Sequence, residues 1–200
     1  MKVIEQEIHS LKNSISEMWA LVHQQLYNAG EAMLTGDKEL AYKVISRERR
    51  VNAFELKIDS DCEDIIALYA PVAIDLRFVL AMYKINTNLE RLGDFAESIA
   101  RFAGNLPEGE PIDPQLVKET RVEEMLSELL SMISLTKEAF EKESSEIASR
   151  IFLKDNLIDE INHNSTAIIA KYIEEHKGSA LAGLYMACLL YTSDAADDRI

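Results

Sequence analysis

Hydrophobic residues recur every three or four positions along most of the chain, with charged and polar residues between them. This spacing is typical of amphipathic helices, which bury one face and leave the other in water. Breaks at Gly, Pro and polar clusters divide the pattern into six predicted helices. Their hydrophobic runs cover residues 4–34, 40–66, 71–103, 114–140 and 147–173, and a sixth run starts at 181.

Two prolines mark the predicted starts of helices. Pro71 has no backbone N–H to donate, so it fits best as the first residue of the third helix. Asp113-Pro114 combines an N-cap residue with a first-turn proline, which indicates the start of the fourth helix. Ser144-Ser145 is a weaker break between the fourth and fifth helices.

The richest Gly and Pro stretch, residues 104–111, separates two halves that share the same plan of three helices. The second helices of the two halves can be overlaid, with Val51-Asn52-x-Phe54 matching Ile158-Asp159-x-Ile161. We therefore predict an all-α fold, a tandem repeat of two antiparallel three-helix bundles that lie side by side. Helices of about 30 residues would make the molecule about 45 Å long.

The predicted divisions are a first repeat over 1–104, a linker over 105–113 and an incomplete second repeat over 114–190. Residues 191–200 do not fit the overlay, because they are small and polar where the first repeat has Glu90-Arg91-Leu92-Gly93-Asp94. The sixth helix is therefore expected to be truncated, followed by a non-native tail that resembles translated sequencing-adapter read-through.

Charge and hydropathy exclude several classes of protein. The chain has 21 Lys and Arg against 35 Asp and Glu, a net charge of −14, which argues against nucleic-acid binding. No apolar run approaches the roughly 18 residues of a membrane span, so a cytoplasmic protein without membrane insertion is expected. Cys62 and Cys188 lie in separate apolar contexts and are expected to be buried, reduced thiols.

Three carboxylates share one face of the predicted third helix. Glu90, Asp94 and Glu97 lie at about 0°, +40° and −20° around its axis. Like charges at this spacing repel one another, and a bound hard cation would turn them into a ligand set. A solvated acidic face explains the same pattern, and the spacing alone leaves both interpretations open.

Helix two carries a second acidic pair, Glu55 and Asp59, at the edge of its apolar stripe. Such a pair can meet carboxylates from an adjacent helix, as in the carboxylate metal sites of helical bundles. Asp75, in the first turn of helix three, favours the positive end of the helix dipole, so capping is its simpler role.

Catalytic motifs are otherwise missing from the sequence, which predicts a protein that is not an enzyme. The enzyme alternative is a carboxylate-bridged di-metal oxidase, which needs a Glu-x-x-His pair on each of two helices. Only Glu160 with His163 fits that requirement. A metal-free helical adaptor or scaffold is the stronger alternative.

Three blocks of the sequence stand out in order along the chain. They are Val51-Asn52-x-x-Glu55-x-x-Ile58-Asp59-x-x-Cys62, Leu68-Tyr69-Ala70-Pro71-Val72-Ala73-Ile74-Asp75-Leu76-Arg77 and Lys84-Ile85-x-x-x-Leu89-Glu90-Arg91-Leu92-Gly93-Asp94. Together they resemble the PhoU family of phosphate-specific transport accessory proteins. The resemblance covers residues 1 to about 190. It implies tandem three-helix bundles in a cytoplasmic homodimer.

The resemblance also implies a function. Proteins of this family act as negative regulators of the phosphate-starvation response, link a phosphate ABC transporter to a sensor histidine kinase, and help to limit phosphate uptake. Family members bind multinuclear iron, zinc or manganese clusters through Glu/Asp-x-x-x-Asp motifs. The motif maps onto Glu55 with Asp59 and onto Glu90 with Asp94. Asp155 with Asp159 keeps the spacing in the second half, but the sixth-helix motif is absent.

Overall fold

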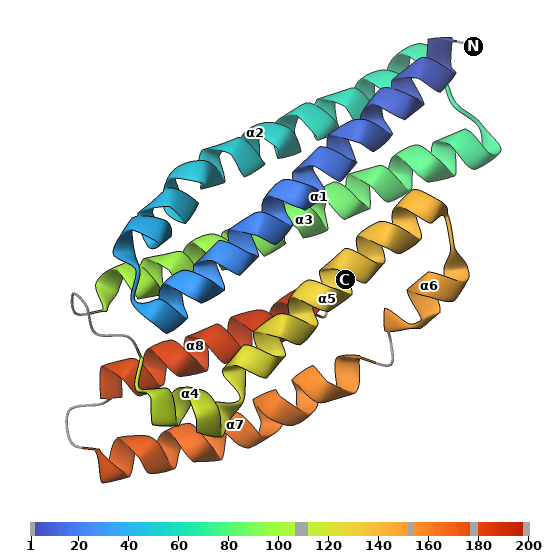
Figure 1. The fold of residues 1–200 in the computed structure, drawn as a ribbon. Coiled ribbons are helices and arrows are strands. Elements are labelled where there is room, and N and C mark those ends of the chain that lie inside the picture. The colour runs from blue at the N-terminus through green and yellow to red at the C-terminus, as the bar shows by residue number, and fades with distance from the viewer. Residues whose placement is uncertain (1–2, 107–111, 152–153, 177–179, 198–200) are drawn as a thin grey trace.

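Three long antiparallel helices form the first repeat, α1 (Val3–Thr35), α2 (Lys38–Tyr69) and α3 (Ala73–Asn105) (Figure 1). The computed structural model describes residues 3–106, 112–151, 154–176 and 180–197, and within these ranges it contains helices and no strand. The predicted all-α tandem repeat is confirmed. Five residues of the predicted 105–113 linker, 107–111, lie outside the described ranges.

The turns of the first repeat follow from local capping. Asp37 begins α2 by accepting a hydrogen bond from the backbone N–H of Leu40 at 2.9 Å. At the other end of α2, Ala70 takes a left-handed conformation with φ 44° and donates its N–H to the carbonyl of Ile66. Because the chain needs extended residues to reverse after this cap, α3 begins only at Ala73. The prediction that Pro71 is the first residue of that helix is therefore wrong.

The described residues of the second repeat form five helices: α4 (Pro114–Thr120), α5 (Val122–Lys142), α6 (Ser145–Ser149), α7 (Asp155–Glu175) and α8 (Ala180–Asp197). Asp113 caps α4 as predicted, accepting a hydrogen bond from the backbone N–H of Gln115.

The continuous helix predicted over 114–140 is interrupted at Arg121, whose φ is 56°. The guanidinium of Arg121 donates hydrogen bonds to Glu124 of α5 and Glu160 of α7, and these bonds hold the break in place. The helix predicted over 147–173 is likewise divided, into α6 and α7. Both predictions of continuous helices are wrong at these breaks.

Helix α8 continues to Asp197, so the tail predicted to begin at Tyr191 starts inside a helix. Residues 198–200 lie outside the described ranges. Leu181 and Leu184, near the start of this helix, are exposed. Met186, Leu189 and Leu190 are buried and lie on the inner face of this helix.

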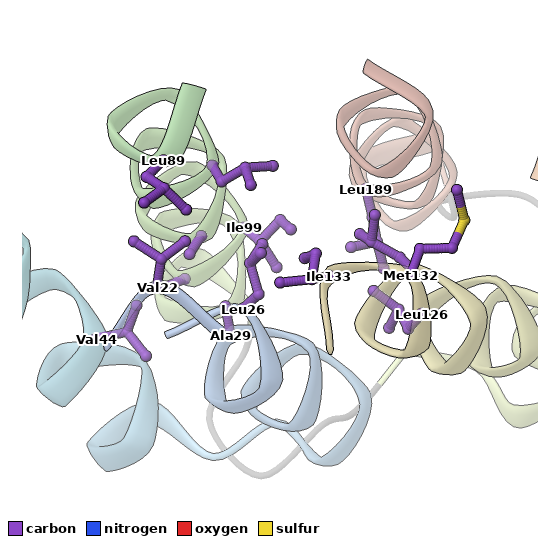
Figure 2. Close-up of a cluster of buried hydrophobic side chains, with 14 of the residues drawn as sticks. Val22, Leu26, Ala29, Val44, Leu89, Ile99, Leu126, Met132, Ile133 and Leu189 are labelled. Carbon is purple, nitrogen blue, oxygen red and sulfur yellow. The ribbon is translucent and has the colours of Figure 1, made fainter. Parts of the chain in front are cut away.

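The two repeats lie side by side and share one hydrophobic core (Figure 2). The core runs from Val44 of α2 through α1 and α3 to Ile133 of α5 and Leu189 of α8. The indole N–H of Trp19 in α1 donates a hydrogen bond to the carbonyl of Ile133 at 3.2 Å. Phe102 of α3 stacks on Tyr185 of α8 at a centroid distance of 5.4 Å.

The cysteines are free thiols, as predicted, although only Cys62 is fully buried and Cys188 is partly exposed. Burial raises the pKa of the Cys62 thiol to about 12, which keeps it protonated. Among the described residues, none of the helices combines the length and the apolar character needed to cross a membrane.

Candidate functional site

Acidic side chains from α2 and α3 gather on one side of the first repeat, and we call them the α2–α3 acidic face. Its members are Glu48, Glu55 and Asp59 of α2 and Glu90, Asp94 and Glu97 of α3. Four of the six, Glu55, Asp59, Glu90 and Asp94, are the residues onto which the Glu/Asp-x-x-x-Asp motif maps.

The carboxylates of the two predicted pairs lie close enough for their charges to affect one another. Burial, followed by the charges of Asp94 and Glu55, raises the pKa of the Glu90 carboxyl to about 7. Burial, followed by the charges of Asp59 and Asp94, also raises the pKa of Glu55. Carboxylates from both helices therefore act on one another, as expected when like charges share a partly buried surface.

Asn86 of α3 fixes the position of Asp59 across the helix pair. Its fully buried side-chain amide donates to the Asp59 carboxylate at 2.7 Å and to the backbone carbonyl of Glu55 at 3.0 Å. The two helices also approach closely at Gly93, where an added Cβ would lie 2.8 Å from a methyl carbon of Val51. A side chain larger than hydrogen at position 93 would push the two halves of the face apart.

Glu48 belongs to the face although the sequence motifs did not select it. The side chain is 8% exposed, and its Oε2 accepts a hydrogen bond from Asn52 at 2.9 Å. Burial, followed by the charges of Glu97 and Asp94, raises the pKa of this carboxyl. A signal was available in the sequence, because position 48 lies two helical turns before Glu55 on the same side of α2.

In the described part of the chain, two buried oxygens have no hydrogen-bond partner here, Oε1 of Glu48 in the face and Oδ1 of Asn86 beside it. Buried polar atoms without a partner are uncommon, and they are candidates for contact with water or an ion. Oxygen donors of this kind suit hard cations.

The same face lacks a preformed metal-binding geometry. Within the described ranges, no three His, Cys, Asp or Glu side chains are arranged so that they could hold one metal ion. The carboxylate oxygens are therefore suitable ligands for a cation. The side chains would have to move before several of them could bind the same ion. What the face provides as it stands is a concentrated negative charge.

The other candidate residues lie apart from this face. Glu160 pairs with Arg121 at 3.0 Å, and His163 is exposed, so the di-metal alternative gains no support from them. Asp75 is exposed in the first turn of α3, in the position expected for a dipole-stabilising acid. Asp159 is exposed, and the side chain of Asp155 lies outside what the structure describes.

Comparison with known proteins identifies the fold and its two repeats. The PhoU domain matches residues 15–103 and 122–195, which correspond to the two repeats. The chain belongs to the PhoU family. Among the relatives of this PhoU chain is a "Phosphate-specific transport system accessory protein PhoU homolog" of Aquifex aeolicus. It is 33% identical over 171 residues, which are 84% of this chain and 75% of the relative.

Further relatives and solved structures agree with this assignment. The PhoU accessory protein of Escherichia coli strain K12 is 32% identical over 90% of this chain and 75% of its own. The crystal structure of the phosphate transport system regulatory protein PhoU from Streptococcus pneumoniae superposes with a TM-score of 0.86 at 26% identity, covering 98% of this chain and 90% of that one. PhoU from Pseudomonas aeruginosa, 24% identical with a TM-score of 0.86, shares the fold over 98% of this chain and 92% of its own. The relatives from Aquifex aeolicus and Escherichia coli are named accessory proteins, and the one from Streptococcus pneumoniae is named a regulatory protein.

Proposed function

We propose that this PhoU-family protein is a cytoplasmic negative regulator of the phosphate-starvation response and of phosphate uptake. It would act as an adaptor between a phosphate ABC transporter and a sensor histidine kinase, as a homodimer. The observation that carries this proposal is the match of both repeats to the PhoU domain, together with relatives named as accessory proteins of phosphate transport.

The residues of the chain favour a mechanism in which the protein acts by binding to a partner protein. The chain carries no recognised catalytic motif, and its most concentrated chemistry is a surface of carboxylates. An adaptor without catalysis changes its partner's activity by binding one state of that partner more tightly than another. Coupling of 1–3 kcal/mol, which is about 5- to 150-fold in affinity, is typical of such regulation.

The same proposal includes a multinuclear iron, zinc or manganese cluster on the α2–α3 acidic face. Glu55, Asp59, Glu90 and Asp94 would hold it. The raised pKa values of Glu55 and Glu90 support a cation there, because bound positive charge would relieve the repulsion that raises them. The metal would add positive charge to a surface that otherwise repels anionic partners.

Gene replacement in the source organism tests the regulatory role. Deletion should switch on an alkaline-phosphatase reporter of phosphate starvation in phosphate-rich medium and increase the uptake of radiolabelled phosphate. A plasmid copy of the chain should reverse both effects. A deletion strain that keeps the reporter silent and uptake unchanged would contradict the proposal.

Elemental analysis of protein purified without chelator tests the metal. Wild-type protein should contain iron, zinc or manganese, and the Glu90→Gln/Asp94→Asn variant should lose most of it. Glu123→Gln/Glu174→Gln is the matched control, because it removes the same charge from exposed positions of the second repeat. Equal metal content in all three proteins would exclude the face as the binding site, and absence of metal in the wild type would favour the metal-free adaptor.

A further inference from the structure

The connection between α2 and α3 exposes large apolar side chains to solvent. Leu68 is 72% exposed, Val72 74% and Ile74 79%, and we call these three residues the apolar tip. The connection between α2 and α3 lies at the end of the first repeat where α1 starts (Figure 1). Scattered single hydrophobic residues are normal on a surface, but three within seven positions form a cluster that favours contact with a partner.

The backbone of this connection is held in an uncommon conformation. Ala70 has φ 44° and Ala73 has φ 49°, a region that residues with a Cβ seldom occupy. Pro71 between them is buried, which anchors the turn while its apolar neighbours point outward. Strain of this kind persists where the surrounding structure fixes the chain, so the apolar tip is presented on a defined turn.

An apolar groove opens beside the tip. It has a volume of about 660 Å³ and runs between α1, α3 and the end of α5. Ile74 belongs to its lining, together with Ile8, Phe78, Met82 and Phe140. A partner that covers the tip can therefore also insert an apolar side chain into the groove. That side chain would be buried in a pocket, in addition to the area buried on the tip.

Acidic residues surround the tip. Glu5 and Asp75 lie at the groove, which also carries His9 and the Lys12–Glu143 ion pair, in which the two charges offset one another at 2.8 Å. Glu63 and Asp64 are exposed on the last two turns of α2. Arg77 is the basic residue of the same end of α3. The rim is therefore negative, which complements a partner whose apolar residues are flanked by Lys or Arg.

The negative rim also argues against two other occupants. Anionic lipid headgroups would be repelled, and attraction to membranes usually needs a basic patch instead. A second copy of this chain, related by a two-fold axis, would bring the same acidic rim against itself, and each chain carries a net charge of −14.

We propose that the apolar tip is a docking surface for a basic, amphipathic segment of another protein, with its apolar side chains on Leu68, Val72 and Ile74 and its Lys or Arg side chains against the acidic rim. This inference rests on the proposed function, since the phosphate transporter supplies the partner. Along α3 the tip is about 24 Å from Glu90, and along α2 it is about 14 Å from Asp59, at a rise of about 1.5 Å per residue. It is therefore separate from the acidic face.

The test measures binding of the intact chain to the purified transporter of the source organism in nanodiscs. The Val72→Ser/Ile74→Ser variant should bind at least tenfold more weakly than the wild type. The matched control, Tyr42→Ser/Leu184→Ser, removes two other exposed apolar side chains and should bind normally. The Asp64→Lys/Asp75→Lys variant should also lose at least tenfold at low salt, and circular dichroism should show that all variants remain folded.

The outcomes separate this inference from the proposed function. If Val72→Ser/Ile74→Ser binds the transporter as tightly as the wild type does, the apolar tip is not the docking surface, whereas the proposed function is unaffected. Wild-type protein that does not bind the transporter would count against the function. The docking surface is then tested alone with a 14-residue Leu/Lys helical peptide, which should bind the wild type at least tenfold more tightly than Val72→Ser/Ile74→Ser.

Three results would overturn the assignment of a basic protein partner. The first is equal binding of the Leu/Lys peptide and a Leu/Glu peptide. The second is sedimentation with phosphatidylcholine/phosphatidylglycerol vesicles that depends on Val72 and Ile74, which would indicate a lipid surface. The third is a dimer in analytical ultracentrifugation that dissociates in Val72→Ser/Ile74→Ser, which would indicate a second copy of the chain.

Discussion

The carboxyl group of Glu90 changes its charge near neutral pH. Its pKa rises from an ordinary value of 4.5 to about 7 because burial and the neighbouring carboxylates disfavour its ionised form. The folded protein therefore holds this proton more tightly than the unfolded chain does. By linkage, the Glu90 carboxyl lowers the stability of the fold increasingly as pH rises from about 4.5 to about 7.

We expect Glu90→Gln to stabilise the metal-free protein above pH 7. Each pKa unit corresponds to about 1.4 kcal/mol, and solvent screening reduces the full shift to a gain on the order of 1–2 kcal/mol. The gain should vanish near pH 4, where Glu90 is protonated in both states. Urea unfolding in EDTA at pH 4 and pH 8 measures it, with Glu123→Gln as the exposed control. A gain independent of pH would contradict the assigned cause.

Ala70 supplies a second prediction at the scale of one residue. Its left-handed conformation at the end of α2 costs a residue with a Cβ about 1–2 kcal/mol, and glycine avoids this cost. Ala70→Gly should therefore raise the free energy of unfolding by about 1 kcal/mol. The control is Ala67→Gly, an exposed position inside α2, which should lower it by about 1 kcal/mol. Thermal unfolding that moves both variants in the same direction would refute this explanation.

At the scale of the element, the contact of α2 with α3 depends on Gly93. Glycine is normally unfavourable inside a helix, by roughly 1 kcal/mol relative to alanine. It is needed here because Val51 of α2 occupies the space that a Cβ would take. The helix pair that carries the acidic face is therefore held at a separation set by these two residues.

Gly93→Ala should destabilise the protein by about 1–3 kcal/mol in spite of the better helix propensity of alanine. The double variant Val51→Ala/Gly93→Ala should recover part of the loss relative to the sum of the two single changes. Denaturant unfolding of all four proteins completes the cycle. Simple additivity would show that the two positions do not compete for space.

The sequence predicted some elements better than others for identifiable reasons. The first three helices have strong periodicity and clear breaks at Gly36 and Pro71, so their existence and order could be predicted. The break at Arg121 contains no Gly or Pro. Its guanidinium forms ion pairs with Glu124 and with Glu160, and Glu160 is 39 residues away in the sequence. Local patterns cannot reveal such a partner.

The acidic face was predictable in part. Glu55, Asp59, Glu90 and Asp94 follow from spacing on two helices, because i and i+4 positions share a face. Spacing could not reveal that Asn86 would bond to Asp59, since that contact depends on how α2 and α3 pack. Whether the face binds a metal and which partners the protein has stay predictions, which the proposed experiments test.

At the scale of the whole molecule, the repeats should unfold together because they share a core. Trp19, the one tryptophan of the chain, lies at their boundary and bonds to Ile133 of the second repeat. Its fluorescence and the helical circular dichroism should therefore report one coincident transition.

Leu189→Ala, in the second repeat, should shift the transition that Trp19 reports from the first repeat. Leu189 is fully buried, and removing it from a core typically costs about 2–5 kcal/mol. Leu184→Ala, on the exposed side of the same helix, is the control and should cost far less. Two separate transitions, with Trp19 fluorescence unaffected by Leu189→Ala, would mean that the repeats are independent units.

The joint between α4 and α5 has a consequence for how the chain can be cut. Trypsin cleaves after arginine but needs several residues in an extended conformation to fit its cleft. Arg121 forms the joint without an inserted loop, and its side chain is engaged by carboxylates on both sides. Although the Arg121 side chain is 40% exposed, its backbone joins two helices and is not extended, so digestion should begin elsewhere while the protein stays folded.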